Sequence, residues 1–161
     1  MSRDGRENVH RLHDELSDVM IRNVTVKRDN ADLKKTIEFI KTLRERYENI
    51  HLDDKGSSVN QTYVFASQFG PMLEIALVIA KGALLRDEFR GAHYKPDFPE
   101  RDDKHWLKTT IATYDPKKDE PVISYVPVDM RYLKPISRDY SKAKKVVPHF
   151  DNLPSNIPLP V

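Results

Sequence analysis

The chain has 161 residues and no cysteine, and its 27 basic and 25 acidic side chains leave a formal net charge of +2. This length is typical of one domain. The near balance of charge does not predict binding to nucleic acid, which we do not expect as a partner. The lack of cysteine excludes disulfides, cysteine nucleophiles, cysteine-held iron–sulfur clusters and cysteine zinc sites within this chain.

Nucleotide-binding and membrane-spanning segments are not expected either. Five glycines are present, and none forms a G-x-G-x-x-G or P-loop motif. The longest apolar run, residues 72–85, is interrupted by Glu74 and Lys81, so it falls short of the roughly 20 apolar residues that cross a bilayer. The first residues are charged and lack the apolar stretch of a secretory signal.

The first half of the chain predicts helices. Apolar residues recur at intervals of three and four within residues 9–20, after a candidate cap at Asn8. A second helix is expected from Asn30, with Asp32 in its first turn, and it should end before the turn-forming loop at residues 53–58. Its apolar seam comprises Leu33, Ile37, Ile40, Leu43 and Tyr47.

The third predicted helix is the longest and most apolar, and Ser58 and Asn60 are alternative caps for it. Gly70-Pro71 predicts a kink or a short break, because proline lacks a donor and clashes with the preceding turn. Its expected inward face comprises Val64, Phe65, Met72, Ile75, Ala76, Ile79 and Ala83. Further apolar residues widen this sector, so the helix should be central to the bundle or touch another surface.

After Gly91 the sequence changes character. Residues 105–114 and 122–126 are rich in β-branched and aromatic side chains and predict an antiparallel hairpin. A helix that starts at Asp102 or Asp103 is the competing prediction. Five of the eleven prolines lie in residues 135–161, among basic residues at 138, 142, 144 and 145. An extended arm on a partner and a disordered tail remain alternatives there, and phosphate binding by its basic residues is only weakly indicated.

Two groups of polar residues invite a chemical interpretation. His10 and His13 have the spacing of a metal pair, but no third ligand is evident, so a solvated helix face is favoured. The carboxylates at 97, 100, 102 and 103 lie near Arg90, His93 and Arg101 in the sequence. Two carboxylates with different pKa values can divide acid and base roles in hydrolysis, but a salt-bridged structural loop is the favoured interpretation.

Residues 88–107 read E-F-R-G-A-H-Y-K-P-D-F-P-E-R-D-D-K-H-W-L. This segment closely resembles the C-terminal region of the succinate dehydrogenase/fumarate reductase flavoprotein subunit, where the pattern is E-S-R-G-A-H, then D-F-P-x-R-D-D, then W-L. The resemblance extends back through residues 43–54 and the third helix and forward to residues 134–142, so it covers nearly the whole chain. The tail is most similar to the branch that couples to menaquinone through a haem-bearing membrane cytochrome.

The resemblance implies a mainly α fold. We expect a spectrin-repeat-like three-helix bundle at residues 1–86, a loop and small β-hairpin of the same domain at 87–134, and an extended proline-rich tail at 135–161. In this family the FAD-binding domain, the histidine that links to FAD and the residues that bind the dicarboxylate all lie upstream. No part of this chain matches them, so we expect no catalytic residue, cofactor or metal here, and FAD only in the parent protein.

The family motif supplies candidate docking residues, which are Arg90, Gly91, His93, Asp97, Arg101, Asp102 and Trp106. Gly91 suits a positive φ or a close backbone approach after the third helix. Arg90 suits a two-pronged bond at an interface, so Arg90→Ala is expected to disturb assembly of the parent more than folding. Two features depart from the family: Phe89 stands where serine is usual, and Gly70-Pro71 interrupts a helix that the family more often carries through.

The parent that the resemblance implies interconverts succinate and fumarate with FAD and passes electrons through an iron–sulfur subunit to quinone. The expected partners are the FAD-binding domain of the same polypeptide, the iron–sulfur subunit and, indirectly, a membrane cytochrome b anchor at the cytoplasmic face of the membrane. One alternative is a free-standing helical interaction module, and another is the C-terminal domain of a related flavoprotein such as an L-aspartate oxidase. The segment 97–107 and the tail at 138–140 favour the dehydrogenase.

Overall fold

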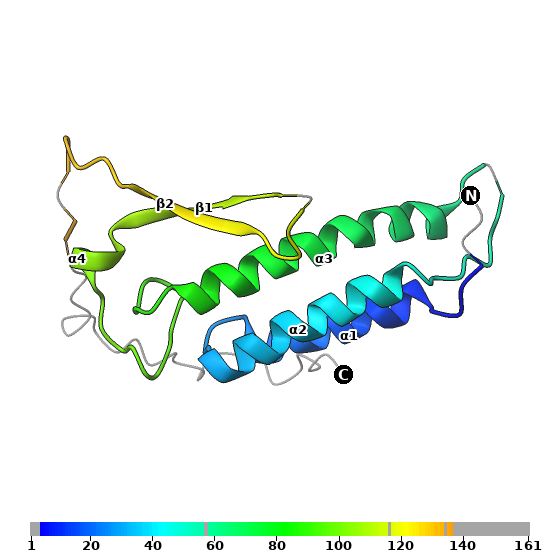
Figure 1. Ribbon diagram of the computed structural model, residues 1–161, viewed down its shortest axis with the longest axis horizontal. Helices are drawn as coiled ribbons and strands as arrows, with labels where there is room; N and C mark the ends of the chain where they lie inside the picture. Colours follow the sequence, from blue (N-terminus) through cyan, green and yellow to red (C-terminus); the bar gives the residue numbers. More distant parts are fainter. Residues whose placement is uncertain (1–3, 57, 116, 134, 137–161) are drawn as a thin grey trace, which may run out of the picture. The chain divides into compact units, whose positions relative to one another are not determined.

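Three long helices and one hairpin form most of the regular structure in this computed structural model, which describes residues 4–56, 58–115, 117–133 and 135–136. The described elements are α1 (Val9–Asn23), α2 (Asn30–Tyr47), α3 (Gln61–Leu85), α4 (Asp103–Trp106), β1 (Lys108–Thr113) and β2 (Val122–Pro127) (Figure 1). All of them belong to the first of two compact units, which divide between Val128 and Asp129. The predicted mainly α fold with a small β-hairpin is confirmed.

The predicted division at residues 1–86, 87–134 and 135–161 stays a prediction. Only 135 and 136 of the predicted tail are among the described residues. The tail's basic residues at 138, 142, 144 and 145 lie outside them.

Each long helix begins at a side chain that caps its first turn. Asn8 accepts hydrogen bonds from two backbone N–H groups of α1, and Asp29 does the same for α2. Asn60, one of the two candidate caps for α3, accepts from the backbone N–H of Tyr63 at 2.7 Å. These caps satisfy donors that have no partner inside the helix. The predicted starts of α1 and α2 are therefore confirmed.

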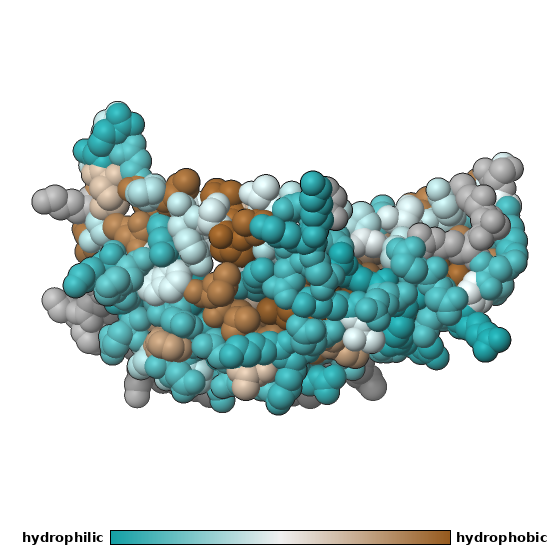
Figure 2. Space-filling model, in the orientation of Figure 1, coloured by the Kyte–Doolittle hydropathy of each residue, from teal (hydrophilic) through white to brown (hydrophobic). Residues whose placement is uncertain are grey.

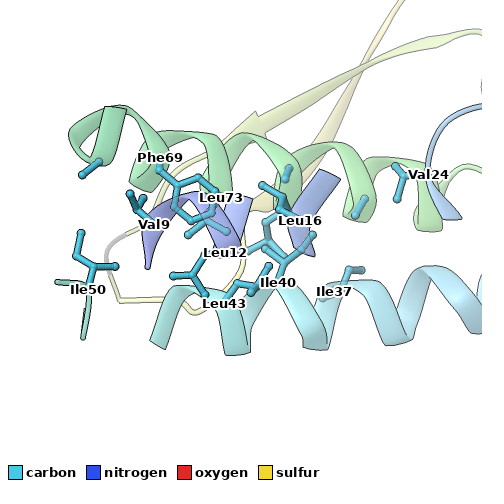
Figure 3. Close-up of a cluster of buried hydrophobic side chains, with 14 of the residues drawn as sticks. Val9, Leu12, Leu16, Val24, Ile37, Ile40, Leu43, Ile50, Phe69 and Leu73 are labelled. Carbon is cyan, nitrogen blue, oxygen red and sulfur yellow. The ribbon is translucent and has the colours of Figure 1, made fainter. Parts of the chain in front are cut away.

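The core lies between the three long helices (Figure 3). Its buried apolar residues are Val9, Leu12 and Leu16 of α1, Leu33, Ile37, Ile40 and Leu43 of α2, Ala66, Phe69, Leu73, Ala76, Leu77, Ala80 and Ala83 of α3, and Val24, Ile50 and Leu52 from the connections. Tyr47 is partly buried, and its hydroxyl donates to the Ala66 carbonyl at 2.8 Å. The predicted seam of α2 is confirmed.

The predicted inward face of α3 is wrong for four of its seven residues, while Phe65 is partly buried against the core as expected. Ala76 and Ala83 are buried, but Ile75 is 59% exposed and Ile79 is 45% exposed. Val64 and Met72 also point outward. The helix is apolar on most of its circumference, so the spacing of apolar residues did not distinguish the two sides. On the inner side, alanines that let the helices approach closely lie beside the large side chains of Phe69, Leu73 and Leu77, while other large aliphatic residues of α3 are left outside.

Helix α3 runs through Gly70-Pro71 without the predicted break. A Cβ at Gly70 would lie 3.0 Å from the Tyr47 ring, so glycine allows α2 and α3 to approach closely here. Contrary to the expectation from sequence, α3 is long and apolar enough to cross a membrane by length and composition. The core helix of a soluble protein passes the same test, and α3 packs against both α1 and α2.

The two predictions for the segment after Gly91 are both realised in succession. The short helix α4 starts at Asp103, and β1 follows it and pairs antiparallel with β2. Lys108 lies opposite Pro127 and Thr113 opposite Val122. Figure 1 shows the hairpin lying alongside α3. Ion pairs from Lys41 and Lys81 to Glu120, at 2.6 and 2.8 Å, fasten the loop of the hairpin to α2 and α3.

Replacing Pro71 by alanine should stabilise the chain. Pro71 is exposed and interior to α3, so alanine restores one helical N–H donor and removes the ring's clash with the preceding turn. We expect the free energy of unfolding in urea to rise by about 1–3 kcal/mol. Gln68→Ala, at another exposed position of the same helix, should change it by less than about 0.5 kcal/mol. A loss of stability in Pro71→Ala would show that the proline does not strain the helix at this site.

Candidate functional site

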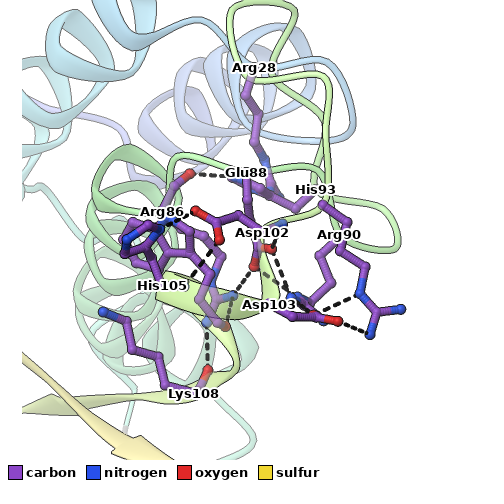
Figure 4. Close-up of polar contacts among 11 residues, drawn as sticks. Arg28, Arg86, Glu88, Arg90, His93, Asp102, Asp103, His105 and Lys108 are labelled. Carbon is purple, nitrogen blue, oxygen red and sulfur yellow. Dashed lines mark hydrogen bonds and ion pairs between the residues drawn. The ribbon is translucent and has the colours of Figure 1, made fainter. Parts of the chain in front are cut away.

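The segment that follows α3 is organised around one buried carboxylate, Glu88 (Figure 4). Arg86 forms an ion pair with it, and Arg90 grips both of its oxygens through Nε and Nη2 at 2.8 and 2.9 Å. The backbone N–H of Asp102 donates a further hydrogen bond at 3.2 Å. A buried charge is costly without such partners. The two arginines and one amide therefore hold the chain from 86 to 102 in a single arrangement.

Arg86 also connects the end of α3 to the hairpin. Its guanidinium donates to the carbonyls of Trp106 and Lys108 at 3.1 and 2.7 Å, and it lies 5.3 Å from the centre of the Trp106 ring. The Lys108 ammonium in turn lies 4.3 Å from the Trp106 ring and 4.1 Å from the Tyr125 ring. These cation–π contacts and backbone bonds place β1 relative to α3.

Asp103 extends the network toward α4. It accepts from Arg90 at 2.7 Å and from Arg101 at 2.6 Å. The Arg101 and Arg90 guanidiniums lower the pKa of Asp103 to about 2. A carboxyl whose pKa is lowered by folding stabilises the protein at any pH above the carboxyl's pKa in the unfolded chain. The contribution of Asp103 is therefore lost only as the pH falls below about 4 toward 2.

Asp102 has a separate role as the cap of α4. Its side chain accepts from the His105 backbone N–H at 3.1 Å and from the His105 ring at 2.7 Å, and this histidine lowers its pKa.

A second cluster, around the buried side chains of Lys95 and His93, contacts backbone carbonyls at the end of α3. The Lys95 ammonium donates to the Leu84 carbonyl at 2.9 Å and to Asp87 at 2.8 Å. His93 contacts Arg28 and the Arg86 carbonyl. Burial lowers the pKa of both His93 and Lys95.

The candidate docking residues divide by their exposure and partners. Arg90 has its two-pronged bond, but on Glu88 of the same chain, and Arg101 pairs with Asp103. His93 is buried, and Trp106 is partly buried. Gly91 has the expected positive φ, at 60°, and is exposed, as is Asp97. Their docking role stays a prediction, and Gly91 and Asp97 are the members most open to a partner.

Sequence reasoning missed Arg28, Arg86, Asp87, Glu88 and Lys95 as site residues. Charged side chains are almost never fully buried unless paired, so nothing in their local pattern marked Glu88 or Lys95 as buried. The only available signal was the place of Glu88 at the head of the family motif. His10 instead stacks on Phe65, and His13 meets the same ring edge-on, at 4.6 and 5.4 Å between ring centres. No group of three metal-ligating side chains occurs among the described residues.

Three of the exposed apolar side chains of α3, Met72, Ile75 and Ile79, line a groove between α1 and α3. The groove holds about 260 Å³ and is lined by His13, Leu16, Ser17, Met20, Met72, Ile75, Ala76 and Ile79. It contains no carboxylate or lysine. Such a lining suits an apolar surface of another protein segment rather than a charged small molecule.

The sequence matches the family described as "Fumarate reductase flavoprotein C-term" over residues 13–140. This chain belongs to that family. It is 48% identical over 144 residues to the succinate dehydrogenase flavoprotein subunit of Bacillus subtilis, which covers 89% of this chain and 25% of that protein. The fumarate reductase flavoprotein subunit of Haemophilus influenzae is 36% identical over 137 residues, covering 85% of this chain and 23% of that protein.

Solved structures agree with this assignment. A chain of the E. coli quinol fumarate reductase superposes with a TM-score of 0.76 at 30% identity, over 85% of this chain and 24% of that one. Mycobacterium smegmatis Sdh1 superposes with a TM-score of 0.67 at 28% identity, over 75% of this chain and 20% of that one. The chain matches the C-terminal domain of these flavoproteins and spans about a quarter of the length of the curated relatives.

The described residues do not fit the FAD that the family implies. A dinucleotide is bound by a glycine-rich turn between a parallel strand and a helix N-terminus. The strands described here pair only in an antiparallel hairpin. Gly91, the glycine with positive φ among the described residues, follows α3 and precedes an irregular loop.

Replacing Glu88 by glutamine should destabilise the chain strongly. The change leaves the half-buried guanidiniums of Arg86 and Arg90 without their shared countercharge, which costs about 3 kcal/mol in the free energy of unfolding. Asp97→Asn is the matched control, because Asp97 is an exposed carboxylate in the same motif, and it should change stability by less than about 0.5 kcal/mol. Equal effects of the two substitutions in urea unfolding would show that Glu88 does not organise the segment.

Proposed function

We propose that this chain serves as a structural and docking domain of a succinate dehydrogenase or fumarate reductase flavoprotein. In that parent, FAD supplies the hydride chemistry that interconverts succinate and fumarate, and electrons pass through an iron–sulfur subunit to quinone. The fragment itself holds its partners in position and supplies a contact surface for them. Its proposed partners are the FAD-binding domain of the same polypeptide, the iron–sulfur subunit and, indirectly, a membrane cytochrome b anchor at the cytoplasmic face of the membrane.

The observation that carries this proposal is the apolar surface on the outer side of α3. Figure 2 shows hydrophobic surface over α3 and the hairpin amid hydrophilic surroundings. Met72, Ile75 and Ile79 share the groove described above with α1. Contiguous exposed apolar surface in a soluble protein marks an interaction site. The curated relatives are about four times as long as this chain, which supports their remaining polypeptide as the occupant of this surface.

A free-standing interaction module is the second candidate function, because the same groove would serve it. The two differ in what precedes the chain. A reading frame that continues upstream into a G-x-G-x-x-G segment supports the flavoprotein domain, whereas an independent gene without one supports the module.

A charge placed in the groove should separate docking from folding. Ile75→Asp should leave the melting temperature of the 161-residue chain within about 3 °C of the wild type, because Ile75 is mostly exposed. In the flavoprotein that contains this chain, the same change should reduce succinate oxidation with a dye acceptor at least about tenfold, because a buried unpaired carboxylate opposes packing of the domains. Ile21→Asp is the matched control, since Ile21 is 62% exposed on α1 and does not line the groove.

Two outcomes would contradict the proposal. Full activity of the flavoprotein with Ile75→Asp would show that the groove is not a docking surface. Bound flavin and succinate oxidation by the 161-residue chain alone would show that the redox site lies within it.

A further inference from the structure

The connection between α1 and α2 lies against the segment that follows α3. The backbone N–H of Arg28 donates to the Tyr94 carbonyl at 2.9 Å, and the N–H of Tyr94 donates to the Val26 carbonyl at 3.3 Å. His93, next to Tyr94, places its ring between the two segments (Figure 4). The contact therefore joins residues that are 65 positions apart in the sequence.

The partners of His93 determine its protonation state. On one side, Nε2 lies 2.7 Å from the carbonyl oxygen of Arg86, which can only accept, so Nε2 carries a hydrogen. On the other side, Nδ1 contacts Nη1 of Arg28, and a guanidinium can only donate. Nδ1 must therefore present its lone pair. The ring is neutral, with its single proton on Nε2, and both nitrogens are satisfied.

The side chain of Arg28 is itself held in place. Its Nε donates to the Val24 carbonyl at 2.8 Å, so the guanidinium spans the end of α1 and the ring of His93. His93 is 8% exposed, so water does not replace either partner easily.

The charged groups around the ring oppose a second proton. Positive charges come from Arg28 in the α1–α2 connection, from Arg86 at the end of α3 and from Lys95 in the segment of His93 itself. The nearby carboxylates are already paired, Asp87 with Lys95, and Glu88 with Arg86 and Arg90. Neither carboxylate is positioned to accept from Nδ1. A proton added to Nδ1 would point its N–H at the N–H of Arg28, and the charged ring would repel the positive guanidinium.

We propose that His93 is a proton-sensitive latch, in which protonation of Nδ1 breaks the bond from Arg28 and loosens segment 88–95 from the α1–α2 connection. The proposal does not depend on the proposed function. In a parent flavoprotein it would make the arrangement of the family motif sensitive to mild acid.

The sign of the pH dependence follows from where the proton binds. Burial and the neighbouring cations lower the pKa of His93 below its ordinary value of 6.5. The unfolded chain then takes up this proton more readily than the folded one. The stabilisation is fully present above about pH 6.5 and is lost as the pH falls from there through the lowered pKa of the folded state.

The first test reads the ring directly in the 161-residue wild-type chain. Long-range ¹H–¹⁵N correlation spectra distinguish the two neutral tautomers and the charged form of each histidine. At pH 7.5 we expect His93 to be neutral with its hydrogen on Nε2. As the pH is lowered, the ring should become charged only at a pH below 6.5. A charged ring or a hydrogen on Nδ1 at pH 7.5 would overturn the proposal, and this measurement needs no variant to fold.

The second test measures the consequence for stability. The melting temperature of the wild type should fall between pH 7.5 and pH 5.0 by at least about 3 °C more than that of His93→Gln, whose amide does not titrate. His51→Gln, at an exposed histidine that pairs with Asp53, should keep the wild-type fall. Equal falls of the melting temperature in the wild type and in His93→Gln would overturn the proposal of a latch.

Discussion

The arrangement of the segment after α3 depends on one constraint: the carboxylate of Glu88 is buried and must be fully partnered. Arg86, Arg90 and the backbone of Asp102 meet this need together. Because they lie on both sides of the loop 91–101, the loop has to fold back on itself. Asp102 is thereby placed to cap α4, and Arg86 is placed to hold the start of β1. A single buried charge thus positions a loop, a helix and a strand.

The C-terminal end of α3 links this constraint to the three-helix bundle. The last turn of α3 contains no basic residue of its own to satisfy its carbonyls. Lys95 supplies the missing cation from outside the helix, through its bond to the Leu84 carbonyl, and His93 donates to the carbonyl of Arg86, two residues further on. The family motif therefore acts as the cap of α3. Its residues serve folding first, and any contact with a partner uses what remains exposed.

Local patterns predicted the elements well, and they failed where the answer depends on distant residues. The caps Asn8 and Asn60 and the seam of α2 are readable because they involve neighbours within one or two turns. Glu88 and Lys95 are not readable in this way, since a charged residue is buried only when partners from elsewhere in the chain converge on it. The resemblance to a family located the segment, but it did not reveal which of its side chains point inward.

The outward-facing apolar side chains of α3 have a physical meaning. When only one side of a helix packs against the core, its large apolar residues face the core and its polar residues face water. In α3 large apolar residues lie on both sides, because Phe69, Leu73 and Leu77 are buried together with four alanines while Met72, Ile75 and Ile79 lie outside. Leaving these apolar side chains toward water is unfavourable for a domain that stands alone. This pattern supports the proposal that α3 is covered on two sides, by the bundle over Phe69, Leu73 and Leu77 and by a second protein surface over Ile75 and Ile79.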